Sequence, residues 1–150
     1  MIAYPDTSFL CSVYRKQVHT PAALAHRGAM NEPLYFTSLL EFEFIQSIRL
    51  QVWLHARDRA KGYSMREADQ MLADWEADAA AGVNVLVPCD ADAVLRLARS
   101  FSLQHTASQG HRTLDVMHVA TAVHLRAKQF LTFDDRQRSL ALHAGLGVPV

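Results

Sequence analysis

Two acidic residues in the last third of the chain have the positions expected of a hydrolytic site in an α/β protein. Asp115 lies near the start of a segment, residues 114–125, whose apolar residues recur at helical spacing. Residues 130–133 form a short apolar run typical of a buried strand, and Asp134 follows directly. Open α/β sheets place their ligand sites at the carboxyl ends of the strands. We therefore expect both carboxylates at one edge of a sheet.

The N-terminus supplies a third acid. Residues 1–4 have the composition of a short strand, and Asp6, Thr7 and Ser8 come immediately after it. An acid at a junction between a strand and a helix can cap the helix by accepting a hydrogen bond from a backbone N–H. It can equally hold a hydrated cation, and the sequence by itself favours the cap.

A long helical segment after the predicted strand at residues 34–36 contains two more acids. Glu41 and Glu43 are embedded among apolar residues. A buried or half-buried glutamate costs free energy unless it is paired or bound to a cation. These glutamates therefore add to the candidates for one acidic site.

Clustered carboxylates favour one kind of chemistry. Acids within a few ångströms of one another repel, so at least one stays protonated unless a cation neutralises them. Oxygen ligands without a matching set of histidines or cysteines indicate Mg²⁺ or Mn²⁺, and such an ion supports hydrolysis at a phosphoryl group. The sequence has no serine elbow, no Cys–His pair, no P-loop and no glycine-rich dinucleotide turn. These absences argue against covalent nucleophilic catalysis.

The remaining elements predict a single α/β domain over residues 1–150. Short strands alternate with longer helices, a pattern typical of a mainly parallel sheet flanked by helices. Predicted strands cover residues 1–4, 34–36, 83–87 and 130–133, with 148–150 as a candidate edge strand. Predicted helices cover residues 9–14, 20–30, 38–61, 64–80, 91–103, 113–125 and 136–144, and a polar loop covers 104–112.

Two local features leave alternatives open. Pro5 cannot donate to a strand ladder, so we expect it at the very end of the first strand or where no partner accepts. Met71, Leu72 and Trp75 share one face of the predicted helix at residues 64–80. That face either belongs to the core or buries against a second copy of the chain.

The composition limits where the protein acts and how it binds partners. Half of the residues are hydrophobic, one fifth are charged and the formal net charge is zero. Any nucleic acid must therefore be held by local basic patches and a bound metal rather than by overall charge. No apolar run approaches the ~20 residues that span a bilayer, and the two cysteines are too few for a disulfide framework. We expect a cytoplasmic protein.

Four segments together resemble the PIN-domain family, and most closely its VapC-type ribonuclease toxins. They are Asp6-Thr7-Ser8-Phe9-Leu10, Thr37-Ser38-Leu39-Leu40-Glu41-Phe42-Glu43, Leu114-Asp115-Val116-Met117-His118-Val119-Ala120 and Phe130-Leu131-Thr132-Phe133-Asp134. They occur in the family's order and span essentially the whole chain. The resemblance implies a PIN-like α/β/α sandwich and an Mg²⁺- or Mn²⁺-dependent endoribonuclease that cuts RNA. It also implies a homodimer and a VapB-type antitoxin whose tail covers the active site.

Carried over residue by residue, the resemblance assigns four acids to catalysis and metal binding. Asp6, Asp115 and Asp134 match the family's acids, and Glu43 is preferred over Glu41 because Ser47-Ile48-Arg49 follows at the family's distance. Three hydroxyl residues match positions that hold metal-bound water: Thr7, Ser8 and Thr132.

Several basic residues and one histidine are secondary candidates. Arg112 and Arg136 flank the acids, where they either hold RNA phosphates or antitoxin carboxylates, or pair with surface acids. Arg49 belongs to a basic stretch of the long helix, which is either a solvated face or a phosphate-contacting surface. His118 follows Asp115 by three residues, and we interpret it as a packed or hydrogen-bonded core histidine because hard cations prefer oxygen.

Two other classes of protein remain as rivals. The first is a catalytically silent PIN-like interaction module, in which the acids would be remnants. The second is a receiver-type phospho-acceptor domain. That fold needs paired acids after the first strand and a lysine after the last, and neither is clearly present.

Overall fold

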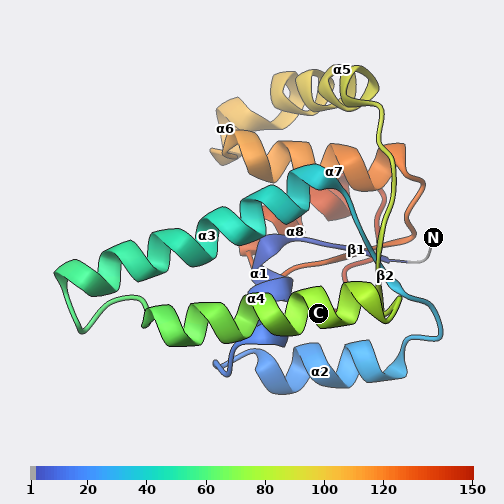
Figure 1. Ribbon diagram of the computed structural model, residues 1–150. Helices are drawn as coiled ribbons and strands as arrows, with labels where there is room; N and C mark the ends of the chain where they lie inside the picture. Colours follow the sequence, from blue (N-terminus) through green and yellow to red (C-terminus); the bar gives the residue numbers. More distant parts are fainter. Residues whose placement is uncertain (1–2) are drawn as a thin grey trace.

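Short strands lie between two layers of helices in the computed structural model, which describes residues 3–150 (Figure 1). The strands are β1 (Ala3–Pro5), β2 (Leu34–Phe36), β3 (Asn84–Leu86) and β4 (Gln129–Leu131). The helices are α1 (Thr7–Tyr14), α2 (Thr20–Ala29), α3 (Ser38–Arg57), α4 (Met65–Ala80), α5 (Ala91–Phe101), the π-helix η1 (Ser102–Thr106), α6 (Ala107–Gln109), α7 (Thr113–His124) and α8 (Asp135–His143). Helices α5 to α7 lie on one side of the strands and α1, α2 and α4 on the other, and the hairpin of α3 and α4 extends beyond both. This arrangement is the predicted α/β/α class.

The strands pair in parallel, as predicted, but the described residues form two ladders rather than one. β1 pairs with β4, and β2 pairs with β3. The Asp6 N–H donates to the Leu131 carbonyl at 2.9 Å, so the N–H of alternate residues points to β4 and the nitrogen of Pro5 points to the opposite edge, where β2 lies. Proline has no hydrogen to donate there. The same residue that ends β1 therefore also separates the two ladders.

The face of α4 that was left open belongs to the core. Met71 and Trp75 are each 2% exposed, and the Trp75 ring packs against the rings of Phe36 and Phe44 at centroid distances of 4.7 and 5.2 Å. Ser64 begins this helix with the expected capping box.

Three predicted boundaries are wrong. Residues 104–112 are not a loop throughout, because nothing in the sequence breaks the helix that starts at Ala91 before Gly110, which closes α6 with φ +70°. Residues 148–150 form no strand, and the chain makes only an isolated bridge, between Gly147 and Gln129. The strand predicted at residues 130–133 ends at Leu131, and the proposed first strand begins at Ala3 in the described part, since residues 1 and 2 lie outside it.

No helix within residues 3–150 is long and apolar enough to cross a membrane.

Gly62 closes the connection between α3 and α4 at a point where no side chain fits. Its φ is +58°, and a Cβ atom built on it would lie 2.0 Å from the backbone oxygen of Gln51 in α3. Left-handed backbone and the backbone clash both exclude larger residues. Gly28, in α2, has open space around it and an ordinary φ.

We predict opposite effects when either glycine is replaced by alanine. Gly62→Ala should lower the free energy of unfolding by at least about 2 kcal/mol, because backbone must move to relieve the clash. Gly28→Ala should raise it by up to about 1 kcal/mol, since alanine is the better helix former. Urea unfolding followed by circular dichroism measures both. Equal stability of Gly62→Ala and the parent would contradict this account of the turn.

Candidate active site

Asp6 is the buried centre of the site. It follows β1, caps α1 and is 0% exposed. Its two carboxylate oxygens accept four hydrogen bonds. Ser8 Oγ and Phe9 N–H donate to Oδ1 at 2.7 and 2.9 Å, and Thr132 Oγ1 and Gln137 Nε2 donate to Oδ2 at 2.6 and 2.9 Å. A buried carboxylate is tolerated when its lone pairs are satisfied in this way.

Two of these donors also fix the backbone of the loop after β4. Phe133 N–H donates to Ser8 Oγ, and Asp134 N–H donates to Thr132 Oγ1, each at 2.9 Å. Each hydroxyl thus accepts from the loop and donates to Asp6. This explains the hydroxyl residues that follow the two strands: they join the end of β1 to the end of β4.

The protonation of Asp6 is governed by its burial. Burial raises the pKa of Asp6, and the hydrogen bonds from Thr132, Ser8 and Phe9 together with the charge of His118 oppose that rise without cancelling it. The pKa of Asp6 therefore lies above its ordinary value.

Glu43 is held from α3 by two residues of other elements. Its Oε2 accepts from Thr7 Oγ1 of α1 and contacts Nε2 of His118 in α7 at 2.5 Å. Burial raises the pKa of Glu43, but the hydrogen bond and charge of His118 and the bond from Thr7 outweigh burial, so the pKa lies below its ordinary value. His118 is 1% exposed, as expected of a hydrogen-bonded core histidine. Glu43 is therefore kept ionised and oriented.

Asp115 and Asp134 each lie at the start of a helix. Asp115 Oδ2 accepts the backbone N–H of Arg112 at 3.0 Å at the beginning of α7. Asp134 Oδ1 accepts the backbone N–H groups of Arg136 and Gln137 at 2.8 and 3.2 Å at the beginning of α8. Unpaired N–H groups at helix starts favour a negative charge there.

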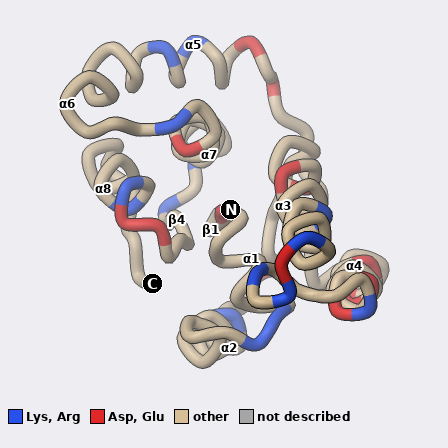
Figure 2. The backbone as a smooth tube through the Cα atoms, turned by 90° about the vertical axis from the view of Figure 1, so that its left-hand side faces the viewer, with Lys and Arg blue, Asp and Glu red and all other residues tan. Residues whose placement is uncertain are grey.

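These acids meet at one cleft of 490 Å³, which Glu43, Asp115 and Asp134 all line. Figure 2 shows acidic segments at the starts of α7 and α8 and in α3 on different sides of β1. The three carboxylates share a pattern: in each, one oxygen accepts the hydrogen bonds given above, and the other accepts none from the described residues. The cleft therefore presents oriented carboxylate oxygens that are not used by the protein.

A hard divalent cation suits the chemistry of this lining but would need the carboxylates to move closer. The acids and hydroxyls that line the cleft, including Thr7 and Ser8, are oxygen donors, the set that Mg²⁺ and Mn²⁺ prefer. Within residues 3–150, no three acidic, histidine or cysteine side chains are close enough to hold one ion as they stand. Each acid is instead drawn toward its own local donors, as expected of like charges in the absence of a cation.

The other predicted site residues divide into two groups. Arg112 lines the cleft. Of the residues that the structure describes, Glu41, Arg49, Thr132 and Arg136 do not line it, and Asp6 lies beneath it, reached through Ser8 and Gln137. Arg49 and Arg136 are exposed.

Sequence reasoning missed three residues of the site. Gln137 donates to Asp6 from α8, and Arg15 and Tyr63 form one end of the cleft, with the guanidinium 4.6 Å from the ring centroid. Gln137 stands three residues after Asp134 in the first turn of a helix, which carries no signal of its own. Arg15 and Tyr63 meet only because α1 packs beside the connection between α3 and α4.

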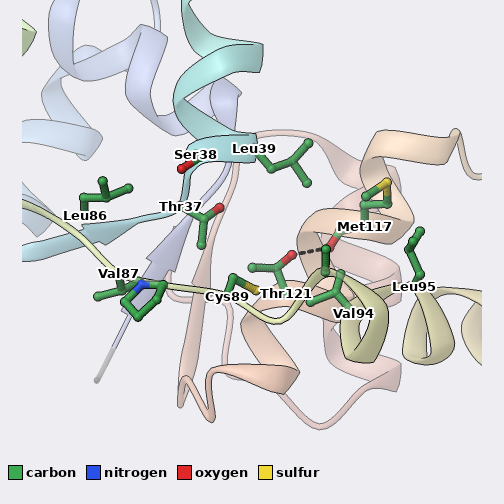
Figure 3. A pocket seen from close by; sticks show the side chains of 12 residues that line it. Thr37, Ser38, Leu39, Leu86, Val87, Cys89, Val94, Leu95, Met117 and Thr121 are labelled. Carbon is green, nitrogen blue, oxygen red and sulfur yellow. Dashed lines mark hydrogen bonds between the residues drawn. The ribbon is translucent and has the colours of Figure 1, made fainter.

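A second cavity lies between α3, α5 and α7 and has a different character (Figure 3). Its volume is 460 Å³, and its lining, which includes Leu39, Val94 and Met117, contains no charged side chain among the described residues. It cannot supply the acids or bases that hydrolysis needs, so the acidic cleft is the candidate active site.

Comparison with known proteins gives a family and a fold. The sequence profile of the PIN domain matches residues 3–142. A comparison with curated proteins finds no match. Similar solved structures include VapC20 from Mycobacterium tuberculosis, described as a sarcin–ricin loop cleaving toxin, with 15% identity, 91% of this chain and 93% of that chain covered, and a TM-score of 0.63. FitAcB from Neisseria gonorrhoeae matches with 14% identity over 98% and 96% of the two chains and a TM-score of 0.66. VapBC-1 from nontypeable Haemophilus influenzae matches with 13% identity over 99% and 96% and a TM-score of 0.62. Identities this low show the fold alone.

The contact between His118 and Glu43 makes a prediction about stability. His118→Ala should lower the free energy of unfolding by about 3 kcal/mol, because it leaves a cavity and removes a hydrogen bond to a charged group. His124→Ala is the matched control on the same helix, since that ring is half-buried and makes no described hydrogen bond, and it should cost less than about 1 kcal/mol. Similar losses in the two variants, measured by urea unfolding, would show that the contact with Glu43 adds nothing.

Proposed function

The chain belongs to the PIN-domain family, and from that premise we propose that it is a metal-dependent endoribonuclease and the toxin of a toxin–antitoxin pair. The substrate is RNA, and the reaction is hydrolysis of a phosphodiester bond. Asp6, Glu43, Asp115 and Asp134 are the proposed acidic residues of the site.

One observation carries this proposal. Three carboxylates that come from α3, α7 and the junction of β4 with α8 line one cleft, and each has one oxygen held by the protein and one that no described residue uses. A structural salt-bridge network would pair these acids with arginine or lysine, and none of the three has such an ion pair in the described structure. Oriented but unpaired acids at strand ends are the arrangement that a cation-binding hydrolase requires.

The residues of the chain divide the work of the site. Mg²⁺ or Mn²⁺, when bound, supplies positive charge that activates water and stabilises charge on a phosphoryl oxygen. Glu43, Asp115 and Asp134 would hold it through their unused oxygens. Thr7 and His118 keep Glu43 in place, and Asp6 fixes the loop that ends in Asp134. Asp6 itself would reach the ion only after exchanging one of its four donors.

Positive charge at the cleft supports an anionic substrate. Arg112 and Arg15 line it, and both can contact phosphates. The same groups could receive the carboxylates of an antitoxin tail, and we assign Arg136 and Arg49, which are exposed outside the cleft, to the antitoxin or to more distant phosphates. The toxin assignment rests on the shared fold with VapC20, VapBC-1 and FitAcB, and we extend it to a VapB-type antitoxin, a homodimer and a cytoplasmic site of action.

The competing proposal is a silent interaction module that keeps the fold without the reaction. Its acids would have no role, yet Glu43 is held by two residues from other elements and Asp6 by four donors. This orientation of the acids favours the enzyme.

Asp115→Asn is expected to abolish hydrolysis without unfolding the chain. The variant should cut total bacterial RNA at least about a hundredfold more slowly in Mn²⁺ or Mg²⁺, because the amide has lost the negative charge that faces the cation. Its melting temperature should be equal to or above that of the parent, since repulsion within the cleft is reduced. Asp135→Asn is the control, because that side chain is fully exposed and lies outside the cleft. Cleavage by Asp115→Asn at the parental rate would remove Asp115 from the site.

Titration with Mn²⁺ separates the enzyme from the silent module without measuring cleavage. Binding to the native state alone stabilises it by about 2.7 kcal/mol at a hundred times the dissociation constant, which raises the melting temperature of a domain this size by several degrees. We expect this rise for the parent and for Asp135→Asn, and a smaller one for Asp115→Asn. No rise in the parent would favour the silent module.

A further inference from the structure

Three aromatic rings form a stack that begins in the core and ends at the surface beside the acidic cleft. The ring of Phe9 is buried, with 0% of the residue exposed. Phe133 lies parallel to it, with a centroid distance of 6.0 Å and an interplanar angle of 11°. His19 covers Phe133 at 4.4 Å and 7°. His19 is exposed, so the stack is open at its outer end.

His19 has no structural task that explains this position. It is the N-cap residue of α2, but its side chain makes no capping hydrogen bond. Neither ring nitrogen has a hydrogen bond or an ion pair with the described residues. The imidazole is thus an exposed planar surface, fixed by stacking, with one donor and one acceptor unused.

The stack is attached to the same atoms that organise the acids. Phe133 lies between Thr132 and Asp134, and its backbone N–H donates to Ser8 Oγ, which in turn donates to Asp6. Neighbouring Cα atoms are about 3.8 Å apart, so a planar group stacked on His19 lies within about one nucleotide of a phosphate at Asp134. The position of the stack relative to the cleft is therefore fixed.

The surrounding segment is basic although the chain as a whole is neutral. Residues 7–31 contain no aspartate or glutamate, and they contain Arg15, Lys16 and Arg27. Arg15 and Lys16 lie in the connection between α1 and α2 that ends at His19. Arg15 lines the cleft and Lys16 is exposed. A polyanion that enters the cleft would pass beside this connection.

We propose that His19, supported by Phe133, is a stacking subsite for an unpaired base of single-stranded RNA, with Lys16 contacting the adjoining backbone. The inference rests on the proposed function, and it names the form of RNA that the site accepts. Unpaired bases stack on aromatic side chains, and every base has a face that can do so. A base inside a duplex is already stacked on both sides and gains nothing from His19.

The test is binding of a short oligoadenylate that carries 2-aminopurine, whose fluorescence is quenched when the base stacks. Binding is measured with EDTA present, so hydrolysis plays no part. His19→Ala should weaken binding by about fivefold to a hundredfold and reduce the quenching, because stacking contributes that much per base. Val18→Ala is the matched control, since Val18 is the neighbouring residue and 84% exposed, and it should bind within about twofold of the parent. His19→Trp should bind at least as tightly as the parent. His19→Ala should keep its melting temperature, because the side chain caps nothing.

The outcomes distinguish this inference from the nuclease proposal. Equal binding and quenching by His19→Ala and the parent would overturn the stacking subsite, even if the parent cuts RNA in Mn²⁺. So would the absence of oligoadenylate binding by the parent. An equal loss for the same strand annealed to its complement would also overturn it, because the effect would then not depend on an unpaired base. Quenching that depends on His19 in a protein that never cuts RNA would support the subsite and count against the nuclease alone.

Discussion

The buried carboxylate of Asp6 determines the geometry on which the candidate active site depends. A carboxylate removed from water is costly unless hydrogen bonds replace its hydration, and here four donors do so. The donors come from α1, from the loop after β4 and from α8, so satisfying one side chain fixes the ends of two strands and the starts of two helices. Pro5 ends the strand before Asp6, and Ser8 and Thr132 carry the bonds to the loop that contains Phe133 and Asp134.

The carboxylates above Asp6 follow a different rule, because each keeps one oxygen for a ligand. Backbone N–H groups at the starts of α7 and α8 hold Asp115 and Asp134, and side chains from α1 and α7 hold Glu43. The protein thus orients the acids before anything binds, which reduces the reorganisation that a cation would require. Positive charge is equally local. A chain with no net charge still has an acid-free basic segment beside the cleft, and local charge, not the total, guides a polyanion.

The sequence predicted the parts of this arrangement that local patterns determine. Helical spacing, caps at Thr37, Ser64 and Asp90, and short apolar runs were enough for the order of elements and the parallel pairing. The acids could be found because they follow strands or begin helices. Long-range contacts could not be predicted, since the bond from Gln137 to Asp6 and the contact of His118 with Glu43 join residues 131 and 75 positions apart. Helix continuation through residues 102–109 was missed because their polar composition resembles a loop, although no proline or glycine interrupts them.

The central claim is that acids scattered from residue 6 to residue 134 form one cation site at the cleft. Crystals of the chain grown or soaked in Mn²⁺ test it directly, because manganese gives an anomalous signal that locates it independently of the protein. The account predicts an anomalous peak within bonding distance of oxygens of Asp115 and Asp134, with Glu43 as a direct or water-mediated ligand. Well-occupied manganese elsewhere and none between these carboxylates would contradict it.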